Sequence, residues 1–514
     1  MFQESELKLA ISQPSMEALL SSSRIKRVAK GKVKRKALVS TYFDTRQHTL
    51  RKSGVALRIR YDGRGYEQTI KIPSYGPAGM QNFSEFNVDV PDMAPDLSLY
   101  QDDALTGALE RWRYRGANLR PVFATRIERD AYVLKLGKTK IEMALDRGEI
   151  ISCVGSMPNS ESVCEVELEM IAGNPVDLFD FAQTLLEKYD VWPLHLTKAE
   201  RGYSLTRENL RPRATKAKKV SVAANSTIFK ALHGVLSAAL EHLFVNHAPT
   251  LAGQPEGVHQ TRVALRRIRA ALRAFKGVLP WDERMAFNGE LRRTLQQLGA
   301  ARDWHVFLAE TWPLLSKAAP DDVNVKPLQR IARNQRLFST REAIAVLTSR
   351  RYMRMLVQFE RWLASMEETG ELAAPIRPYA ERVLKKTLNE LVDTNKSLKR
   401  MWGDELHDLR KRGKKTRYAF EFFNDLISPD GHKLIKTMSS IQDALGQAND
   451  ASMARQLLTL LKPGATEGAV VHFVDHWASE QIESCLNKAG PHWARVRKTA
   501  RDVSYLAAER PDAI

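Results

Sequence analysis

The sequence is poor in cysteine and lacks long apolar runs, and both absences restrict the class of protein. Only Cys153, Cys164 and Cys485 occur in 514 residues, and their spacing suits neither a disulfide framework nor a metal site. No stretch approaches the ~20 continuous apolar residues of a membrane span. The chain begins MFQESELKLAI, unlike a secretory signal. We therefore expect a cytoplasmic protein with reduced thiols and no membrane partner.

Acidic residues are scarce relative to basic ones in the second part of the chain. Residues 1–210 contain 30 Lys and Arg against 28 Asp and Glu, whereas residues 211–514 contain 49 against 32. Most of the net charge of +19 therefore lies after residue 210. Such an excess favours a polyanionic partner, which could be nucleic acid, an acidic membrane surface or inorganic polyphosphate.

The periodicity of apolar residues divides the chain into two expected domains. Short stretches alternate apolar and polar side chains before residue 206, which predicts strands, for example over 4–9, 55–60 and 164–170. Residues 207–224 are basic and aperiodic, as expected of a linker. Residues 225–510 carry long segments with a 3.6-residue apolar period, which predicts a domain made of helices.

The helical region contains an internal repeat. Residues 258–275, VHQTRVALRRIRAALRAF, match residues 406–423, LHDLRKRGKKTRYAFEFF, at an offset of 148. Further on, Leu298, Gly299 and Asp303 match Leu445, Gly446 and Asp450 at an offset of 147. Two matches in the same order at nearly one offset indicate a duplicated helical unit.

Charged side chains occupy alternate positions in several predicted strands. Residues two apart share a face of a strand, so acids gather on two strands and bases on others: Glu4, Glu6 and Lys8; Glu165, Glu167 and Glu169; Arg58 and Arg60; Lys71; Arg129; with Lys198 and Arg201 after the last strand. These faces could simply be solvated. If they enclose one space, the acids require a cation between them, for which oxygen ligands favour Mg²⁺ or Mn²⁺. The bases would suit phosphate. Spacing alone reaches a metal-and-phosphate site and no further.

The first region resembles the CYTH domain of the triphosphate tunnel metalloenzymes. The ESELKL stretch resembles the ExExK signature of that family, and STYFDT, VALRIR, FATRIERDAYVL, CEVELEM and TKAERGY follow in family order. The resemblance covers residues 1–206. It implies an eight-stranded antiparallel tunnel with flanking helices, which hydrolyses inorganic triphosphate with a divalent metal.

The same resemblance implies roles for individual residues. Metal would be held by Glu4, Glu6, Glu165, Glu167 and Glu169, and triphosphate oxygens by Lys8, Arg58, Arg60, Lys71, Arg129, Lys198 and Arg201. Glu4, Glu6 and Lys8 are the expected catalytic residues, and Glu85, Glu142 and Asp146 are further tunnel positions. Phe83 stands where the family usually has arginine, and losing one charged phosphate contact costs about 1.5–3 kcal/mol.

A basic stripe follows one face of the repeated helices. In the first repeat it consists of His259, Arg262, Arg266, Arg269 and Arg273, and in the second of His407, Arg410, Lys414 and Arg417. No acid occurs between Gly257 and Trp281, although solvated helix faces usually mix signs to gain i,i+4 pairs. We interpret the two stripes as one groove for a polyanion. The two histidines could instead form a metal pair.

The second region resembles the CHAD domain. HQTRVALRRIR and LGAARD correspond to the motifs of that family, and the resemblance covers residues 225–510. It implies a pair of pseudo-symmetric helical bundles that bind inorganic polyphosphate. Asp303 and Asp450 are expected to brace the basic residues.

These features together predict a cytoplasmic inorganic triphosphatase that associates with polyphosphate granules. The alternatives are a non-catalytic polyphosphate-binding protein, a triphosphatase for thiamine triphosphate or nucleotides, and an adenylyl cyclase. Nucleic acid is disfavoured as a partner because the basic helices lack a recognised reading motif and regular aromatic residues for base stacking.

Overall fold

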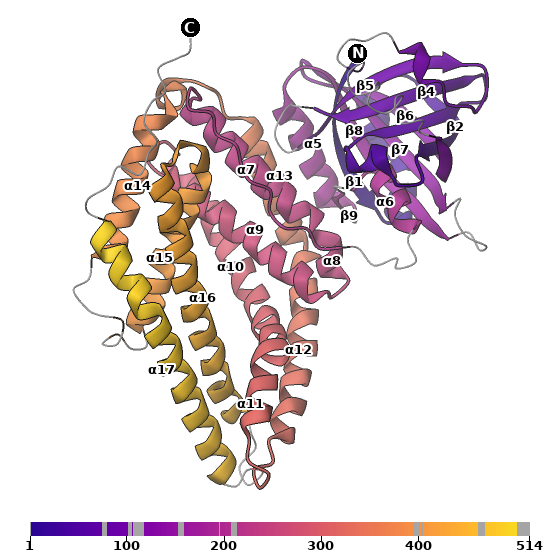
Figure 1. Cartoon of the computed structure of the whole chain (residues 1–514). Helices are drawn as coiled ribbons and strands as arrows, with labels where there is room; N and C mark the ends of the chain where they lie inside the picture. Colours follow the sequence, from indigo (N-terminus) through magenta and orange to yellow (C-terminus); the bar gives the residue numbers. More distant parts are fainter. Residues whose placement is uncertain are drawn as a thin grey trace. The chain divides into compact units, whose positions relative to one another are not determined.

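The computed structural model describes residues 2–74, 80–100, 105, 118–152, 159–194, 196–206, 213–393, 398, 401, 404–460 and 468–500. The chain forms two compact units (Figure 1). Unit 1 comprises Met1–Pro212 and Thr348–Met366, and unit 2 comprises Arg213–Leu347 and Glu367–Ile514. Cys153, residues 207–212 of the expected linker and residues 501–510 lie outside the described part. Cys164 and Cys485 are free thiols.

Unit 1 is built on an antiparallel sheet that closes on itself. Its strands lie in the order β5-β4-β3-β2-β6-β7-β8-β1, and β1 pairs again with β5, while β9 is added beside β1. The strands are β1 (Phe2–Ile11), β2 (Ala29–Asp44), β3 (Ala56–Tyr61), β4 (Tyr66–Pro73), β5 (Gln81–Val90), β6 (Arg120–Leu136), β7 (Thr139–Ser152), β8 (Ser160–Ala172) and β9 (Val191–Pro193). This confirms the predicted eight-stranded antiparallel barrel.

Short helices connect and flank the barrel. They are α1 (Gln13–Ser21), α2 (Ser23–Val28), α3 (Thr49–Lys52), α5 (Pro175–Lys188) and α6 (Lys198–Leu205). Helix α5 contacts β7, β8 and β9 and buries Leu178, Phe179 and Leu185. The apolar faces of the strands are thereby covered from outside, and the alternating charged residues are left on the inner face.

Helix α6 carries two predicted site residues into the barrel. A capping box starts it: the Thr197 side chain accepts a hydrogen bond from the Glu200 backbone N–H, and the Glu200 side chain accepts one in return. Lys198, Arg201 and Tyr203 on this helix are all buried. At Gly202 a Cβ atom would lie 2.2 Å from the Phe123 ring, so only glycine lets the helix approach β6 this closely.

Unit 1 also includes a helix from a distant part of the sequence. Helix α13 (Arg350–Ala364) packs along α5. Two exposed ion pairs flank this contact: Arg350 Nη2 lies 2.7 Å from Asp190 Oδ1, and Arg361 Nη2 donates to Asp180 Oδ2 at 3.0 Å. The 3.6-residue period of residues 225–510 predicts helix here as part of the second domain, whereas the packing of α13 on α5 places these residues in unit 1.

Asp44 fastens the end of β2 to the turn that follows it. Its fully buried carboxylate accepts hydrogen bonds from the backbone N–H groups of Thr45, Leu50 and Arg51 and from the Tyr203 hydroxyl, at 2.7–3.0 Å. The Tyr203 bond links this turn to α6. The carboxylate therefore serves the architecture around the inner face.

We expect Asp44→Ala to weaken this end of the barrel by about 3–5 kcal/mol, because four buried donors would lose a charged acceptor. Hydrogen exchange of β2 and α3 peptides, followed by mass spectrometry, measures the change in local opening free energy. Asp44→Asn preserves the shape and should cost less. Equal exchange in Asp44→Ala and the parent chain would contradict this role.

Unit 2 consists of helices, as the sequence predicts. They are α7 (Ile228–Val245), α8 (His247–Leu251), α9 (Pro255–Ala274), α10 (Trp281–Val306), a π-helical turn (Phe307–Thr311), α11 (Trp312–Ala318), α12 (Lys326–Leu347), α14 (Ile376–Val392), α15 (Asp404–Phe422), α16 (Pro429–Leu458) and α17 (Gly468–Thr499). Helices α9 and α15 are the first helices of the two repeats, and they contact each other. Leu265 and Ile268 of α9 and Tyr418 and Phe422 of α15 are buried.

Residues 213–224 lie against unit 2 without regular secondary structure. Val220 and Val222 are buried, and the Asn246 side chain both donates to the Thr215 carbonyl and accepts from the Thr215 N–H at 2.9 Å. The described part of the expected linker is therefore held on the helices.

One helical stretch, Ile228–Leu251, is long and apolar enough to cross a membrane by length and composition. Its most apolar window is 56% buried inside the protein. Core helices of globular proteins pass the same test, so this stretch is weak evidence for a membrane span.

Candidate functional site

Strand pairing brings the predicted charged residues of unit 1 onto the inner face of the barrel. Directly opposed residues in antiparallel strands point to the same side. Lys8 lies opposite Glu167, and Glu6 lies opposite Glu169. Asp146 lies opposite both Arg129 and Glu165. Most of these side chains are buried, which excludes the alternative of solvated faces.

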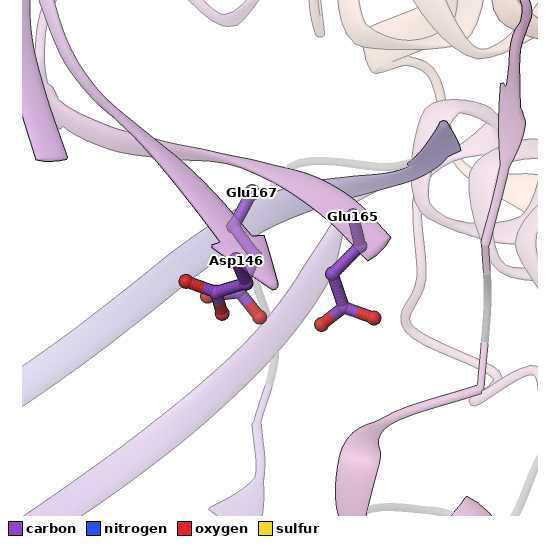
Figure 2. Close-up of side chains that lie close together, drawn as sticks. All are labelled: Asp146, Glu165 and Glu167. Atoms are coloured by element: carbon purple, nitrogen blue, oxygen red, sulfur yellow. The ribbon is translucent and has the colours of Figure 1, made fainter. Parts of the chain in front are cut away.

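A compact acidic group lies on β7 and β8. Asp146, Glu165 and Glu167 are buried, and one oxygen from each lies within 4.8 Å of the others; Figure 2 shows the three carboxylates side by side. Lys198 Nζ contacts all three, at 2.7 Å from Asp146 and 2.9 Å from Glu167. Arg129 Nε donates to Asp146 at 2.7 Å. This group is thus neutralised by the protein's own cations.

The same network extends to Lys8 and Arg201. Lys8 Nζ lies 2.9 Å from both Glu6 and Glu167, and Arg201 Nη1 donates to Glu165 at 2.8 Å. Burial alone would raise the pKa of Glu167, but Lys198, Lys8 and Arg129 outweigh it and hold that pKa well below its usual value. The carboxylate stays ionised and tightly paired.

Lys71 joins a second pair of acids near the start of β1. Its ammonium contacts Glu4 and Glu85, and it lies 5.3 Å from the centroid of the Phe83 ring. Phe83 is opposite Glu4 in the β1–β5 pairing. An aromatic ring therefore flanks this cation where an arginine would have added another charge.

Acid is in excess beside this pair. Glu142 lies opposite Glu169, and neither has an ion-pair partner within the described residues. Burial, followed by repulsion from Glu4, Glu142 and Glu6, raises the pKa of Glu169 to about 8. Burial also raises the pKa of Glu4 to about 7, although Lys71 partly opposes it. Among the described residues here, the acids Glu4, Glu85, Glu142 and Glu169 outnumber the one cation, Lys71, that contacts any of them.

Bases are in excess on β3. Arg58 lies opposite Tyr42 and Arg60 opposite Ser40, and Arg60 Nε donates to the Ser40 hydroxyl at 3.1 Å. Burial, together with the Arg58 and Arg129 charges, lowers the pKa of Arg60 to about 10. Arg58 Nε is buried without a hydrogen-bond partner. An anion would relieve this arrangement.

The interior fits a divalent cation together with phosphates. Glu4, Glu6, Glu142 and Glu169 offer carboxylate oxygens as ligands, which Mg²⁺ and Mn²⁺ prefer. Repulsion among these carboxylates also favours a bound cation. Arg58 and Arg60 supply anion donors on the same inner face. The compact Asp146 group would bind a metal only if Lys198 moved from it.

Two interior residues were not predicted to touch the bases. Tyr42 stacks on Phe123, with ring centroids 4.4 Å apart, and it faces Arg58. Burial tends to raise the pKa of Tyr42, but Arg58, Arg60 and Lys71 reverse this and lower it. Ser40 and Tyr42 alternate along STYFDT, so strand periodicity could have placed both beside the arginines.

Unit 2 brings several residues of the two basic stripes together. Asp303 interacts electrostatically with Arg262 and Arg410, and Asp450 with Arg410. Burial and neighbouring arginines nevertheless lower the pKa of Arg262 to about 10. The two acids thus offset only part of the positive charge, and we call the set Arg262, Arg266, Arg410 and Lys414 the basic cluster.

Among these cations, Lys414 has a strongly lowered pKa. Burial, then the charges of Arg410, Arg266, Arg262 and Arg417, lower its pKa to about 7. Lysines in water titrate near 10.4. We therefore expect Lys414 to change its charge near neutral pH.

The remaining stripe residues have other surroundings. Arg269 donates to Asn288 at 2.8 Å, Arg417 lies 3.6 Å from Glu421, and Arg273 and His407 are exposed. Burial and Arg302 lower the pKa of His259 to about 4, so it is neutral near pH 7. Among the described residues, the one group of side chains close enough together to hold a metal ion is Asp146, Glu165 and Glu167 in unit 1. Neither His259 nor His407 belongs to it.

Comparison with known proteins assigns both units. Residues 3–203 match the CYTH domain and residues 234–459 match the CHAD domain. A protein of Haemophilus influenzae named inorganic triphosphatase is 32% identical over 211 residues, which are 40% of this chain and 55% of that protein. An uncharacterised protein of Mycobacterium tuberculosis is 28% identical over 235 residues, 44% of either chain. The chain spans about half the length of these curated relatives.

Solved structures resemble parts of the chain. The CHAD domain from Ricinus communis is 25% identical with a TM-score of 0.46, covering 57% of this chain and 99% of that one. A putative adenylyl cyclase from Hippeastrum, described as having a dominant triphosphatase activity, is 20% identical with a TM-score of 0.29, covering 40% and 98%. With both scores below 0.5, the assignment rests on the two domain matches: the chain belongs to the proteins in which a CYTH domain is followed by a CHAD domain.

Proposed function

We propose that unit 1 hydrolyses inorganic triphosphate to diphosphate and phosphate with Mg²⁺ or Mn²⁺, and that unit 2 binds inorganic polyphosphate. One observation carries the first part: buried acids and bases on the inner face neutralise one another, with unpaired acid at Glu169 and a crowded base at Arg60. A triphosphate with its cation supplies partners for both kinds of group. The activity named for the Haemophilus relative supports the same substrate.

Each predicted residue has a role in this proposal. Glu4, Glu6 and Glu169 would hold the cation, joined by Glu165 and Glu167 when Lys198 turns from them to phosphate. Arg58, Arg60, Lys71, Arg129, Lys198 and Arg201 would bind phosphate oxygens. A bound cation would neutralise charge on the phosphates and polarise the terminal phosphoryl group.

The reaction requires little covalent chemistry from the protein. The oxygen of a water molecule bonds to the terminal phosphorus as the bond from that phosphorus to the bridging oxygen breaks, and diphosphate leaves with that oxygen. The protons of the water pass to the phosphate products or to solvent. The arginines and lysines stabilise the charge on the transferred group. Lys8 or a neighbouring carboxylate positions the water.

Phosphate release from a substrate panel tests this proposal. Tripolyphosphate, diphosphate, thiamine triphosphate and ATP are each incubated with Mg²⁺, Mn²⁺ or EDTA at neutral and alkaline pH. We expect tripolyphosphate to be hydrolysed fastest and EDTA to stop the reaction. No release from any substrate would overturn the proposal, and cyclic AMP formed from ATP would indicate a cyclase instead.

A non-catalytic role is the second candidate, and Phe83 is the observation that favours it. The ring beside Lys71 stands where one more phosphate-binding charge is usual in the family, and that contact is worth about 1.5–3 kcal/mol. The panel distinguishes the candidates, because a binding protein would retain tripolyphosphate without releasing phosphate.

Polyphosphate binding by unit 2 is supported by the basic cluster. Its cations lie close together and lower one another's pKa, so an external polyanion would remove a repulsion that Asp303 and Asp450 only partly offset. Long phosphate chains carry regularly spaced charges that could engage Arg262, Arg266 and Arg410 together.

We expect polyphosphate affinity to fall as pH rises through 7. Free Lys414 has a pKa of about 7, and a bound polyanion raises it, so binding takes up a proton above pH 7 and weakens by up to about tenfold per pH unit. Isothermal titration calorimetry with long-chain polyphosphate from pH 6.5 to 8.5 measures this. Lys414→Arg should abolish most of the pH dependence; an unchanged slope in that variant would refute the assignment.

A further inference from the structure

The inner face of the barrel extends beyond the point where the barrel is closed. The last residue pair between β2 and β3 is Val39–Tyr61, yet β2 continues to pair with β6 as far as Ala29–Leu134. Strand β6 in turn pairs with β7 as far as Leu136–Thr139. Strand β7 also pairs with β8 as far as Lys140–Ala172. Strands β2, β6, β7 and β8 therefore run past the β3–β4 hairpin.

Lysines cover the inner side of this projection. Lys36 is opposite Arg129, Lys34 is opposite Ala131, and Lys30 is opposite Val133. Further along β6, Lys135 is opposite Lys140. Because opposed residues share a face and alternate residues repeat it, these lysines lie on the same face as Arg129 and the interior acids. We call Lys30, Lys34, Lys36, Lys135 and Lys140 the basic lip.

The charge of the lip is nearly unopposed. All five side chains are exposed, and Lys36 pairs with Asp62 at 3.2 Å. The other four have no ion pair within the described residues. Like charges placed directly opposite each other destabilise a sheet, which makes the Lys135–Lys140 pair a local cost that an anion would relieve.

Protection of a sheet edge explains only part of this pattern. Between residues 29 and 38, no strand of the described residues pairs with the second edge of β2. Edge strands often carry lysines that prevent pairing with other chains. Lys135 and Lys140 lie on β6 and β7, away from that edge. Edge protection also does not require lysines to share the face that leads into the barrel.

The lip is continuous with the candidate site. Glu142 is two residues from Lys140 on the same face of β7, and its neighbour across the strands is Glu169. Arg129, opposite Lys36, reaches Asp146 and Glu167 inside the barrel. An anion bound on the lip would therefore be beside the interior arginines and the surplus acids.

We propose that the basic lip is a capture surface for inorganic phosphate chains, which it concentrates and guides into the barrel. The inference rests on the proposed function of unit 1 and adds a recruitment site outside the residues that contact the reacting atoms. Clustered charge of one sign beside a site raises association rates by about 10–10³-fold, and salt screens the effect.

Lysine footprinting in the full chain tests capture without requiring turnover. The acetylation rates of Lys30, Lys34, Lys135 and Lys140 are measured by mass spectrometry with and without tripolyphosphate or long-chain polyphosphate at low salt. We expect several-fold protection of the lip, and none at the exposed controls Lys52 and Lys188. Unchanged lip rates would overturn the proposal.

Parallel samples with duplex DNA or phosphatidylglycerol vesicles identify the partner class. Protection of the lip by DNA or by vesicles, without protection by phosphate chains, would also overturn the proposal. Weaker protection by these polyanions than by phosphate chains at equal phosphate concentration would support it.

Kinetics then test guidance into the barrel. The variant Lys30→Gln/Lys34→Gln/Lys135→Gln/Lys140→Gln is compared with Arg46→Gln/Lys52→Gln/Arg120→Gln/Lys188→Gln, which removes the same charge from exposed sites elsewhere on unit 1. We expect the lip variant to lose about tenfold in kcat/KM for tripolyphosphate at low salt with kcat unchanged, and the loss to vanish near about 0.5 M salt. If kcat/KM depended on salt in the same way in both variants, guidance into the barrel would be refuted. If the parent chain showed no turnover, the proposed function would be refuted, and the footprinting result alone would decide whether the lip captures phosphate chains.

Discussion

Replacing Glu4 by glutamine is expected to lower metal-dependent phosphate release from tripolyphosphate by about 10³-fold. A catalytic metal ion stabilises the transition state by several kcal/mol, and each ~1.4 kcal/mol corresponds to a tenfold change in rate. Glu4 lies where acid is in excess, and burial raises its pKa to about 7. An amide removes the charge that would hold the cation while preserving the shape.

The same substitution should leave the metal-free fold intact. The protonated form of Glu4 is already favoured by burial and by Glu6 and Glu85, and Lys71 keeps Glu85 as a partner. The Tm without metal should therefore be unchanged or higher. If the parent chain binds Mn²⁺ as proposed, Mn²⁺ should raise its Tm, and this increase should be absent in Glu4→Gln. This pairing of lost activity with retained stability separates metal binding from misfolding.

Glu128→Gln is the matched control for this experiment. Its side chain is on β6 and is 78% exposed, so the substitution removes one carboxylate from unit 1 without entering the barrel. Activity should stay within about twofold of the parent, since surface substitutions rarely change stability by more than ~0.5 kcal/mol. If Glu4→Gln were as active as this control, Glu4 would not hold the metal.

The double variant Arg262→Gln/Arg410→Gln is expected to weaken polyphosphate binding by at least about 10²-fold. Each charge-assisted contact to phosphate contributes about 1.5–3 kcal/mol, and the two arginines come from the two repeats, within the same electrostatic cluster. Equilibrium titration with long-chain polyphosphate, at fixed salt and pH 7, measures the loss.

We expect the stability of unit 2 to be retained in this variant although its affinity for polyphosphate falls. Burial and neighbouring charges lower the pKa of both arginines, so removing two cations relieves repulsion, which offsets the lost bond from Arg262 to the Leu295 carbonyl. Lys411→Gln/Arg293→Gln removes two exposed cations from the same unit and should bind normally. Equal affinity in the two double variants would place polyphosphate elsewhere.

Alternation within strands was sufficient to identify which charged residues share one face of a strand. Glu4, Glu6 and Lys8 repeat every second position, and a period of two sends such residues to one side of any strand. Since the apolar residues between them must be buried, the charged side had to face an interior or solvent. The duplicated arginine helices were likewise visible, because an internal repeat requires no knowledge of contacts.

The ionic partners of Asp146 could not be predicted from the sequence in the same way. Its sequence context indicated only a further tunnel residue, whereas the structure places it opposite both Arg129 and Glu165 and within reach of Lys198. These relations depend on the register of β6, β7 and β8 and on where α6 enters the barrel. Register is decided by long-range pairing, to which local periodicity is blind.

The sequence by itself determined the elements of this protein: strands with charged inner faces, a basic helical repeat, and an excess of cations in the second region. Only the tertiary structure decided that α13 joins unit 1, that Lys198 neutralises the acidic group, and that lysines of three strands form one lip. The physical reason is that periodicity and composition are local properties. Ion pairing, burial and pKa depend on which distant segments come within a few ångströms of each other.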